Sequence, residues 1–120
     1  MEIERRKTME RRYSEMTADE LRQEIADLTE KAQKAHQMGM INEYAVHERK
    51  IVVARSYMRD RKQYKRGQMY EIEGAEGETF EVDYMNGVFA WGVRRNKEGE
   101  LLTEDELEAL PIGLLLKRIN

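Results

Sequence analysis

The chain has 120 residues, enough to bury one core or two small ones that share a boundary. Charged residues make up 38% of it, but the hydrophobic residues recur periodically, which indicates a folded protein and not a disordered one. The absence of cysteine excludes disulfide frameworks, thiolate zinc sites and cysteine nucleophiles, and it favours a cytoplasmic location. No uncharged apolar run reaches the ~18 residues of a membrane span, and the charged start of the chain does not fit a signal peptide.

The net charge of −3 hides an asymmetry between the two halves of the chain. Residues 1–66 contain 16 Lys and Arg against 12 Asp and Glu, whereas residues 67–120 contain 5 against 12, so the halves carry +4 and −7. This polarity predicts either an acidic partner for the N-terminal half or a head-to-tail association of two copies. The alternative interpretation is an ordinary solvated surface.

A capping box at residues 17–20 predicts the start of a first helix, because the side chains of Thr17 and Glu20 accept from each other's backbone N–H groups. Apolar residues then recur at steps of three and four on one narrow face, which is typical of an amphipathic helix. These residues are Leu21, Ile25, Leu28, Ala32 and Ala35. Gly39 is expected to end the helix in a left-handed conformation.

A second helix is predicted from a cap at Asn42 to about Arg59, and the short connection indicates an antiparallel helical hairpin. Its broad apolar face is expected to pack, with Glu48 and Arg55 in that face paired either with each other or across an interface. The broad face comprises Ile41, Tyr44, Ala45, Ile51, Val52 and Met58. A second apolar face of this helix is the candidate interaction surface, and it comprises Val46, Val53 and Tyr57.

Basic residues gather where the helices end, and this segment is interpreted as a linker closed by Gly67. Basic side chains neutralise phosphates and interleaved tyrosines can stack on bases, so the segment is also a candidate nucleic-acid contact. The candidate contacts are Arg55, Arg59, Arg61, Lys62, Lys65 and Arg66, together with a basic arm that includes Arg5, Arg6, Lys7, Arg11 and Arg12. The overall pI near 5.5 and the lack of a recognition-helix signature argue against this function.

Beyond the basic segment the hydrophobic period changes to two, which predicts strands at residues 69–73 and 79–85. The dipeptide Asn86-Gly87 predicts a tight type I′ hairpin, with positive φ at both residues. This turn predicts a register in which Tyr84 faces Phe89, Val82 faces Trp91 and Phe80 faces Val93. All six side chains then lie on one packed face, so Asn86, Gly87 and Trp91 are assigned structural roles.

The end of the chain allows two interpretations. Residues 103–106 either cap a short helix or form an acidic loop before a last strand at residues 109–112, and Leu101 and Leu102 begin a further strand. Residues 113–116 are expected to form a final helical turn. Four or five short strands with a one-sided core indicate a small barrel.

Several stretches in the same order resemble the YfhH family of small Gram-positive bacterial proteins over about residues 13–116. They are residues 41–43, 45–46, 48–51, 84–92 and 109–112. The resemblance implies an α+β fold in which an antiparallel helical hairpin is followed by an SH3-like β-barrel. Family members are uncharacterised and sometimes labelled transcriptional regulators, and they supply no catalytic or binding residues to transfer.

The expected organisation is a basic extension at residues 1–16, the hairpin at 17–60, the basic linker at 61–67 and the barrel at 68–120. The chain departs from the family in the basic extension before Tyr13 and in the acidic insert at residues 96–108. Neither segment inherits a role.

The sequence offers little for catalysis. His36 and His47 are the only imidazoles and lack metal-ligand spacing, while no serine lies in a nucleophile elbow and no glycine cluster forms a phosphate loop. No catalytic, metal or cofactor-binding residue and no small-molecule substrate is therefore predicted.

A peptide groove remains an alternative to catalysis. The aromatic residues Tyr70, Tyr84, Phe89 and Trp91 can line such a groove, but the predicted register favours their burial in the core. The prediction is a non-enzymatic regulatory or adaptor protein that binds a protein partner or itself, with direct nucleic-acid binding as the alternative.

Overall fold

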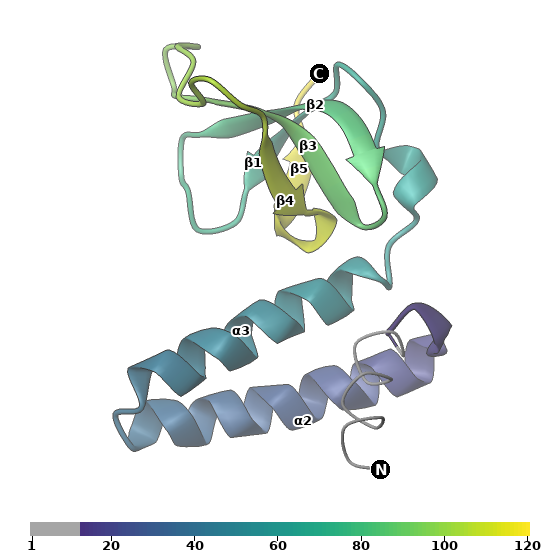
Figure 1. The fold of residues 1–120 in the computed structure, drawn as a ribbon, viewed down its shortest axis with the longest axis vertical. Helices are drawn as coiled ribbons and strands as arrows, with labels where there is room; N and C mark the ends of the chain where they lie inside the picture. The colour runs from purple at the N-terminus through teal and green to yellow at the C-terminus, as the bar shows by residue number, and fades with distance from the viewer. Residues whose placement is uncertain (1–12) are drawn as a thin grey trace. The chain divides into compact units, whose positions relative to one another are not determined.

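The computed structural model describes residues 13–120, which divide between Met58 and Arg59 into two compact units (Figure 1). We call them the hairpin unit and the sheet unit. The α+β class is confirmed, with a two-helix hairpin followed by an antiparallel sheet. The segment predicted as a basic linker belongs to the sheet unit. Most of the predicted basic extension, including Arg5, Arg6, Lys7, Arg11 and Arg12, lies outside the described residues.

Helix α2 (Ala18–Gln37) begins and ends as its local sequence predicts. The Glu20 amide donates to the Thr17 hydroxyl at 3.2 Å, and the Thr17 amide donates to the Glu20 carboxylate at 2.9 Å. At the other end Gly39 has φ +72°, and the amides of Gly39 and Met40 donate to the carbonyls of His36 and Ala35. This is a Schellman motif, which satisfies carbonyls that the helix leaves free. The predicted apolar stripe is confirmed, because four of its five residues are buried and Ile25 is half-buried.

Helix α3 (Ile41–Ser56) packs on α2, and its first half is more exposed than the sequence predicts. Its buried or half-buried residues are Tyr44 and His47 in the first half and every residue from 51 to 56 in the second half, and the Tyr44 ring lies 5.3 Å from that of His36. The helix begins after Met40 without a side-chain cap, so the predicted cap at Asn42 is wrong.

The broad packed face predicted for α3 is confirmed only in part, since Tyr44, Ile51 and Val52 are half-buried. Ile41 is 78% exposed, and Ala45 and Glu48 are exposed as well, so Glu48 lies in solvent while Arg55 is half-buried.

The sheet unit contains five strands in the order β4-β3-β2-β1-β5, and all neighbouring strands are antiparallel. They are β1 (Met69–Ile72), β2 (Thr79–Asn86), β3 (Phe89–Arg95), β4 (Glu108–Pro111) and β5 (Leu115–Arg118). Of the two interpretations of the chain's end, the acidic loop before a last strand is confirmed. Leu101 forms only an isolated bridge to Arg95, and the predicted final turn is a 3-10 helix, η2 (Ile112–Leu114), followed by β5.

The sheet is strongly curled, because η2 joins strands at its opposite edges (Figure 1). Five flat strands would place their edges roughly 19 Å apart at about 4.8 Å per strand. Four residue steps from Pro111 to Leu115 span at most about 14 Å. Strands β4 and β5 form no ladder with each other in the described residues, so the sheet is open where the prediction was a closed barrel.

The register of the β2–β3 hairpin differs from the prediction. The turn residues are Gly87 and Val88, with Asn86 opposite Phe89, and only Gly87 has a positive φ (+61°). A positive φ at the first turn residue alone is the pattern of a type II′ turn, so the predicted type I′ turn is wrong.

The register then shifts between Val82 and Tyr84, where Asp83 is the extra residue of a β-bulge. Tyr84 pairs with Trp91, and Val82 pairs with Gly92. Because of the different turn and the bulge, the side chains on each face of the sheet differ from those in the predicted register. Phe80, Val82 and Ala90 are buried, and they lie on the inner face of the sheet.

Gly92 sits where β3 approaches β2 most closely. A Cβ atom at this position would lie 1.9 Å from the Glu81 carbonyl oxygen and 3.2 Å from the Phe80 ring. A side chain here would therefore push the two strands apart, and the bend of the sheet depends on glycine.

We predict that Gly92→Ala lowers the free energy of unfolding by about 3 kcal/mol, because the added methyl group overlaps backbone that cannot move freely. Gly74→Ala is the matched control, since Gly74 has φ +81° but open space around it, and we expect a loss of about 1 kcal/mol. Urea denaturation of both variants measures the difference. Equal losses would show that the strands do not meet as closely as described.

Candidate functional site

Three aromatic side chains form an exposed surface on the outer face of strands β2 and β3. They are Tyr84, Phe89 and Trp91, which we call the aromatic face. Tyr84 is 48% exposed and Phe89 37%, while Trp91 is half-buried. The Tyr84 and Trp91 rings are stacked, with centroids 5.9 Å apart and planes 2° apart. The prediction that these three residues lie in the core is therefore wrong.

The edge strand β4 leaves the aromatic face accessible from one side. Trp91 pairs with Ala109 and Phe89 pairs with Pro111, so small side chains stand beside the large rings. Tyr70, the fourth aromatic residue considered from the sequence, is buried as predicted. Its hydroxyl donates to the Gln68 side chain at 2.6 Å, and burial raises the pKa of Tyr70.

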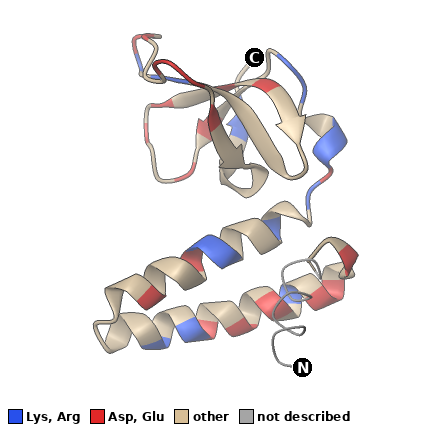
Figure 2. Ribbon diagram, viewed as in Figure 1, with Lys and Arg blue, Asp and Glu red and all other residues tan. Residues whose placement is uncertain are grey.

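The strands and loops of the sheet unit contain many acidic residues (Figure 2). Asp83, beside Tyr84 in the chain, lies 3.5 Å from the guanidinium of Arg66, and Glu81 lies 3.4 Å from that of Arg95. The exposed residues 104–106, which are all acidic, precede β4. Asp83 and Glu81 are paired with arginines, so the exposed acidic residues 104–106 are the charges that favour a positively charged partner.

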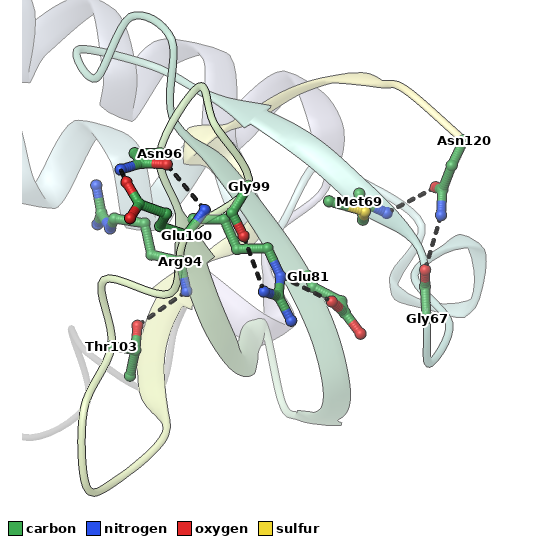
Figure 3. Close-up of polar contacts among 10 residues, drawn as sticks. Gly67, Met69, Glu81, Arg94, Asn96, Gly99, Glu100, Thr103 and Asn120 are labelled. Atoms are coloured by element: carbon green, nitrogen blue, oxygen red, sulfur yellow. Dashed lines mark hydrogen bonds and ion pairs between the residues drawn. The ribbon is translucent and has the colours of Figure 1, made fainter.

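Polar contacts hold the acidic loop against β3 (Figure 3). The Asn96 side chain accepts from the amides of Glu98 and Glu100, and the Arg94 amide donates to the Thr103 hydroxyl at 2.8 Å. The Arg94 guanidinium binds Glu78 at 3.0 Å and Glu108 at 2.6 Å. The Glu108 hydrogen bond raises the pKa of Arg94, and the two ion pairs hold its side chain between the start of β2 and β4.

The predicted nucleic-acid contacts differ in their exposure and in the unit to which they belong. Arg59 is half-buried, and its Nη1 atom donates to the carbonyls of Ile112 at 2.6 Å and Leu115 at 2.5 Å. It holds both ends of η2 and thus serves the fold. The exposed members lie in the short 3-10 helix η1 (Arg61–Gln63) or shortly after it, and they are Arg61, Lys62, Lys65 and Arg66. Arg55 is half-buried and belongs to the hairpin unit.

The predicted interaction residues Val46, Val53 and Tyr57 do lie together, in a groove of the hairpin unit of about 710 Å³. The groove runs between α2 and α3, and Leu28 and Tyr13 also line it. His47 lines it too, and its Nδ1 atom is buried without a hydrogen-bond partner among the described residues.

No group of three or more His, Asp or Glu side chains in residues 13–120 is arranged to hold a metal ion. Neither α2 nor α3 has the length and apolar character needed to cross a membrane.

Comparison with known proteins identifies relatives of this chain. The family model described as "Protein of unknown function (DUF1811)" matches residues 11–116. The chain belongs to the DUF1811 family. It is similar to the "Uncharacterized protein YfhH" of Bacillus subtilis (strain 168), with 48% identity over 110 residues, which are 92% of this chain and 99% of that protein. The resemblance inferred from the sequence is confirmed, and the DUF1811 description supplies no activity.

The role of Arg59 in the fold gives a testable difference between two neighbouring cations. We expect Arg59→Met to lower the free energy of unfolding by about 1–3 kcal/mol, because two carbonyls near η2 lose their donor. Arg61→Met, at an exposed position two residues later, is the control and should change stability by less than about 0.5 kcal/mol. Thermal and urea unfolding measure both. Equal stability of the two variants would contradict the role of Arg59.

Proposed function

We propose that this DUF1811 protein is a non-enzymatic adaptor or regulatory protein whose sheet unit binds an extended, positively charged peptide segment of a partner protein. The aromatic face is the observation that carries the proposal. The curled five-stranded sheet supports an SH3-like architecture whose edges remain open, and small barrels of this kind use aromatic surfaces for peptide recognition.

The chemistry of the surface favours this kind of ligand. Stacked rings offer a rigid apolar platform on which proline rings and the aliphatic stems of Lys and Arg can pack. Because Tyr84 and Trp91 already hold each other in place, little side-chain entropy is lost when a ligand binds. The acidic residues 104–106 favour Lys or Arg beside the contact.

The net charge of the sheet unit also favours a peptide ligand over the nucleic-acid alternative. Residues 67–120 carry a net charge of −7, which repels a phosphate backbone from the sheet. Of the predicted basic contacts, Arg59 is engaged by carbonyls and Arg66 lies beside Asp83. A role in the regulation of transcription would then be exerted through the partner protein.

The experiment uses Trp91 itself as the probe, since it is the single tryptophan of the chain. The full chain is titrated with a polyproline peptide flanked by arginines, the same peptide flanked by glutamates, and single-stranded oligothymidine. We expect the arginine peptide alone to change the Trp91 fluorescence saturably, with an affinity that falls as salt rises.

Two variants localise the binding. Tyr84→Ala and Phe89→Ala should each weaken binding of the arginine peptide at least about tenfold, because both remove exposed aromatic contact. Leu101→Ala is the control, since Leu101 is 52% exposed in the same unit but does not belong to the aromatic face, and it should leave binding unchanged.

Two results would contradict the proposal. Equal binding of the arginine and glutamate peptides would remove the role of charge. Binding of oligothymidine that is lost in the triple variant Arg61→Ala, Lys62→Ala, Lys65→Ala and kept in Tyr84→Ala would favour the nucleic-acid alternative.

A further inference from the structure

Among the described residues of the hairpin unit, apolar side chains that are exposed or half-buried line a groove. Small residues, Ala32, Ala35 and Ala54, make up much of the buried seam between α2 and α3. By contrast, Val46 is 48% exposed and lines the groove together with Val53 and Tyr57. An apolar groove along a helical hairpin is the surface that further helices cover when a bundle is completed.

The charges that line the groove are separated along its length. At one end Glu24 accepts a hydrogen bond from the Tyr13 hydroxyl at 2.7 Å, and the Tyr13 ring lies 6.3 Å from that of Tyr57. Glu24 is therefore near the end of α3, and Asp27 follows it about 4.5 Å along α2. This end of the groove is acidic.

The other end of the groove is basic. Lys31 lies seven residues after Glu24 on α2, which is roughly 10 Å nearer the loop between the helices. Arg49 and Lys50 lie eight and seven residues before Tyr57 on α3, a similar distance toward the same loop. Three cations thus line the part of the groove nearer the loop, beginning at Lys31, which follows Asp27 by four residues or about 6 Å on α2.

We propose that this groove binds a second copy of the same chain, so that two hairpins form an antiparallel four-helix bundle. A two-fold axis across the middle of the groove places the acidic end of one hairpin on the basic end of the other, and the apolar residues meet between them. Two equivalent sets of opposite charges then form, so the surface is complementary to itself. A partner helix of uniform charge would be repelled at one end of the groove.

The proposal does not depend on peptide binding by the sheet unit, because the groove lies entirely within the hairpin unit. Sedimentation equilibrium of the full chain tests it directly. We expect a reversible dimer of twice 14.3 kDa whose dissociation constant rises with salt.

Charge reversal then tests the orientation of the two copies. The double variant Glu24→Lys, Asp27→Lys makes both ends of the groove basic, and Arg49→Glu, Lys50→Glu makes its cationic end mainly acidic. Each variant alone should dimerise at least about tenfold more weakly than the wild type, whereas an equimolar mixture of the two should form the heterodimer. Recovery in the mixture also shows that both variants are folded.

The control reverses two exposed charges of α3 that do not line the groove, Glu43→Lys with Glu48→Lys, and should leave dimerisation unchanged. A chain that remains monomeric at every concentration would overturn the proposal and would leave the groove to a helix of another protein. A dimer that neither charge reversal weakens would place the interface elsewhere and would overturn it equally.

Discussion

One extra residue in β2, Asp83, determines which side chains of the sheet unit face solvent. Side chains alternate along a strand, so one unpaired residue moves every later side chain to the opposite face. Phe80 and Val82, before the bulge, are buried, whereas Tyr84, after it, is 48% exposed and stacks on Trp91. Without the bulge, the side chain of Tyr84 would lie on the inner face of the sheet with those of Phe80 and Val82. The aromatic face, and the peptide binding that we propose for it, depend on this local change of register.

The curl of the sheet depends on contacts between residues far apart in the chain. Gly92 allows β3 to approach the backbone of Glu81, and the bulge adds local twist to β2. Arg59 then fixes the link between the two edge strands by donating to the carbonyls of Ile112 and Leu115. These carbonyls follow Arg59 by 53 and 56 residues, so its charge alone suggested a solvated linker. A cation near a sheet edge is as capable of capping carbonyls as of binding phosphate.

Features that depend on neighbouring residues could be predicted from the sequence. The capping box at Thr17 and the left-handed Gly39 fix the ends of α2 through bonds within a few residues. The grouping of Val46, Val53 and Tyr57 follows from helical period alone, and the structure places all three in one groove. Register could not be predicted in the same way, because Asn-Gly fits more than one turn and a bulge leaves no signal in the alternation of residue types. For this reason the predicted register favoured burial of Tyr84, Phe89 and Trp91 over the alternative of an exposed aromatic surface.

Cross-strand nuclear Overhauser effects test the account most directly, because they report which residues face each other in the β2–β3 hairpin. The bulged register predicts contacts between Tyr84 and Trp91 and between Val82 and Gly92. It also predicts that soluble paramagnetic agents broaden the ring signals of Tyr84 more than those of the buried Phe80. Contacts between Val82 and Trp91, with both Tyr84 and Phe80 protected from the agent, would return the aromatic residues to the core and contradict the account.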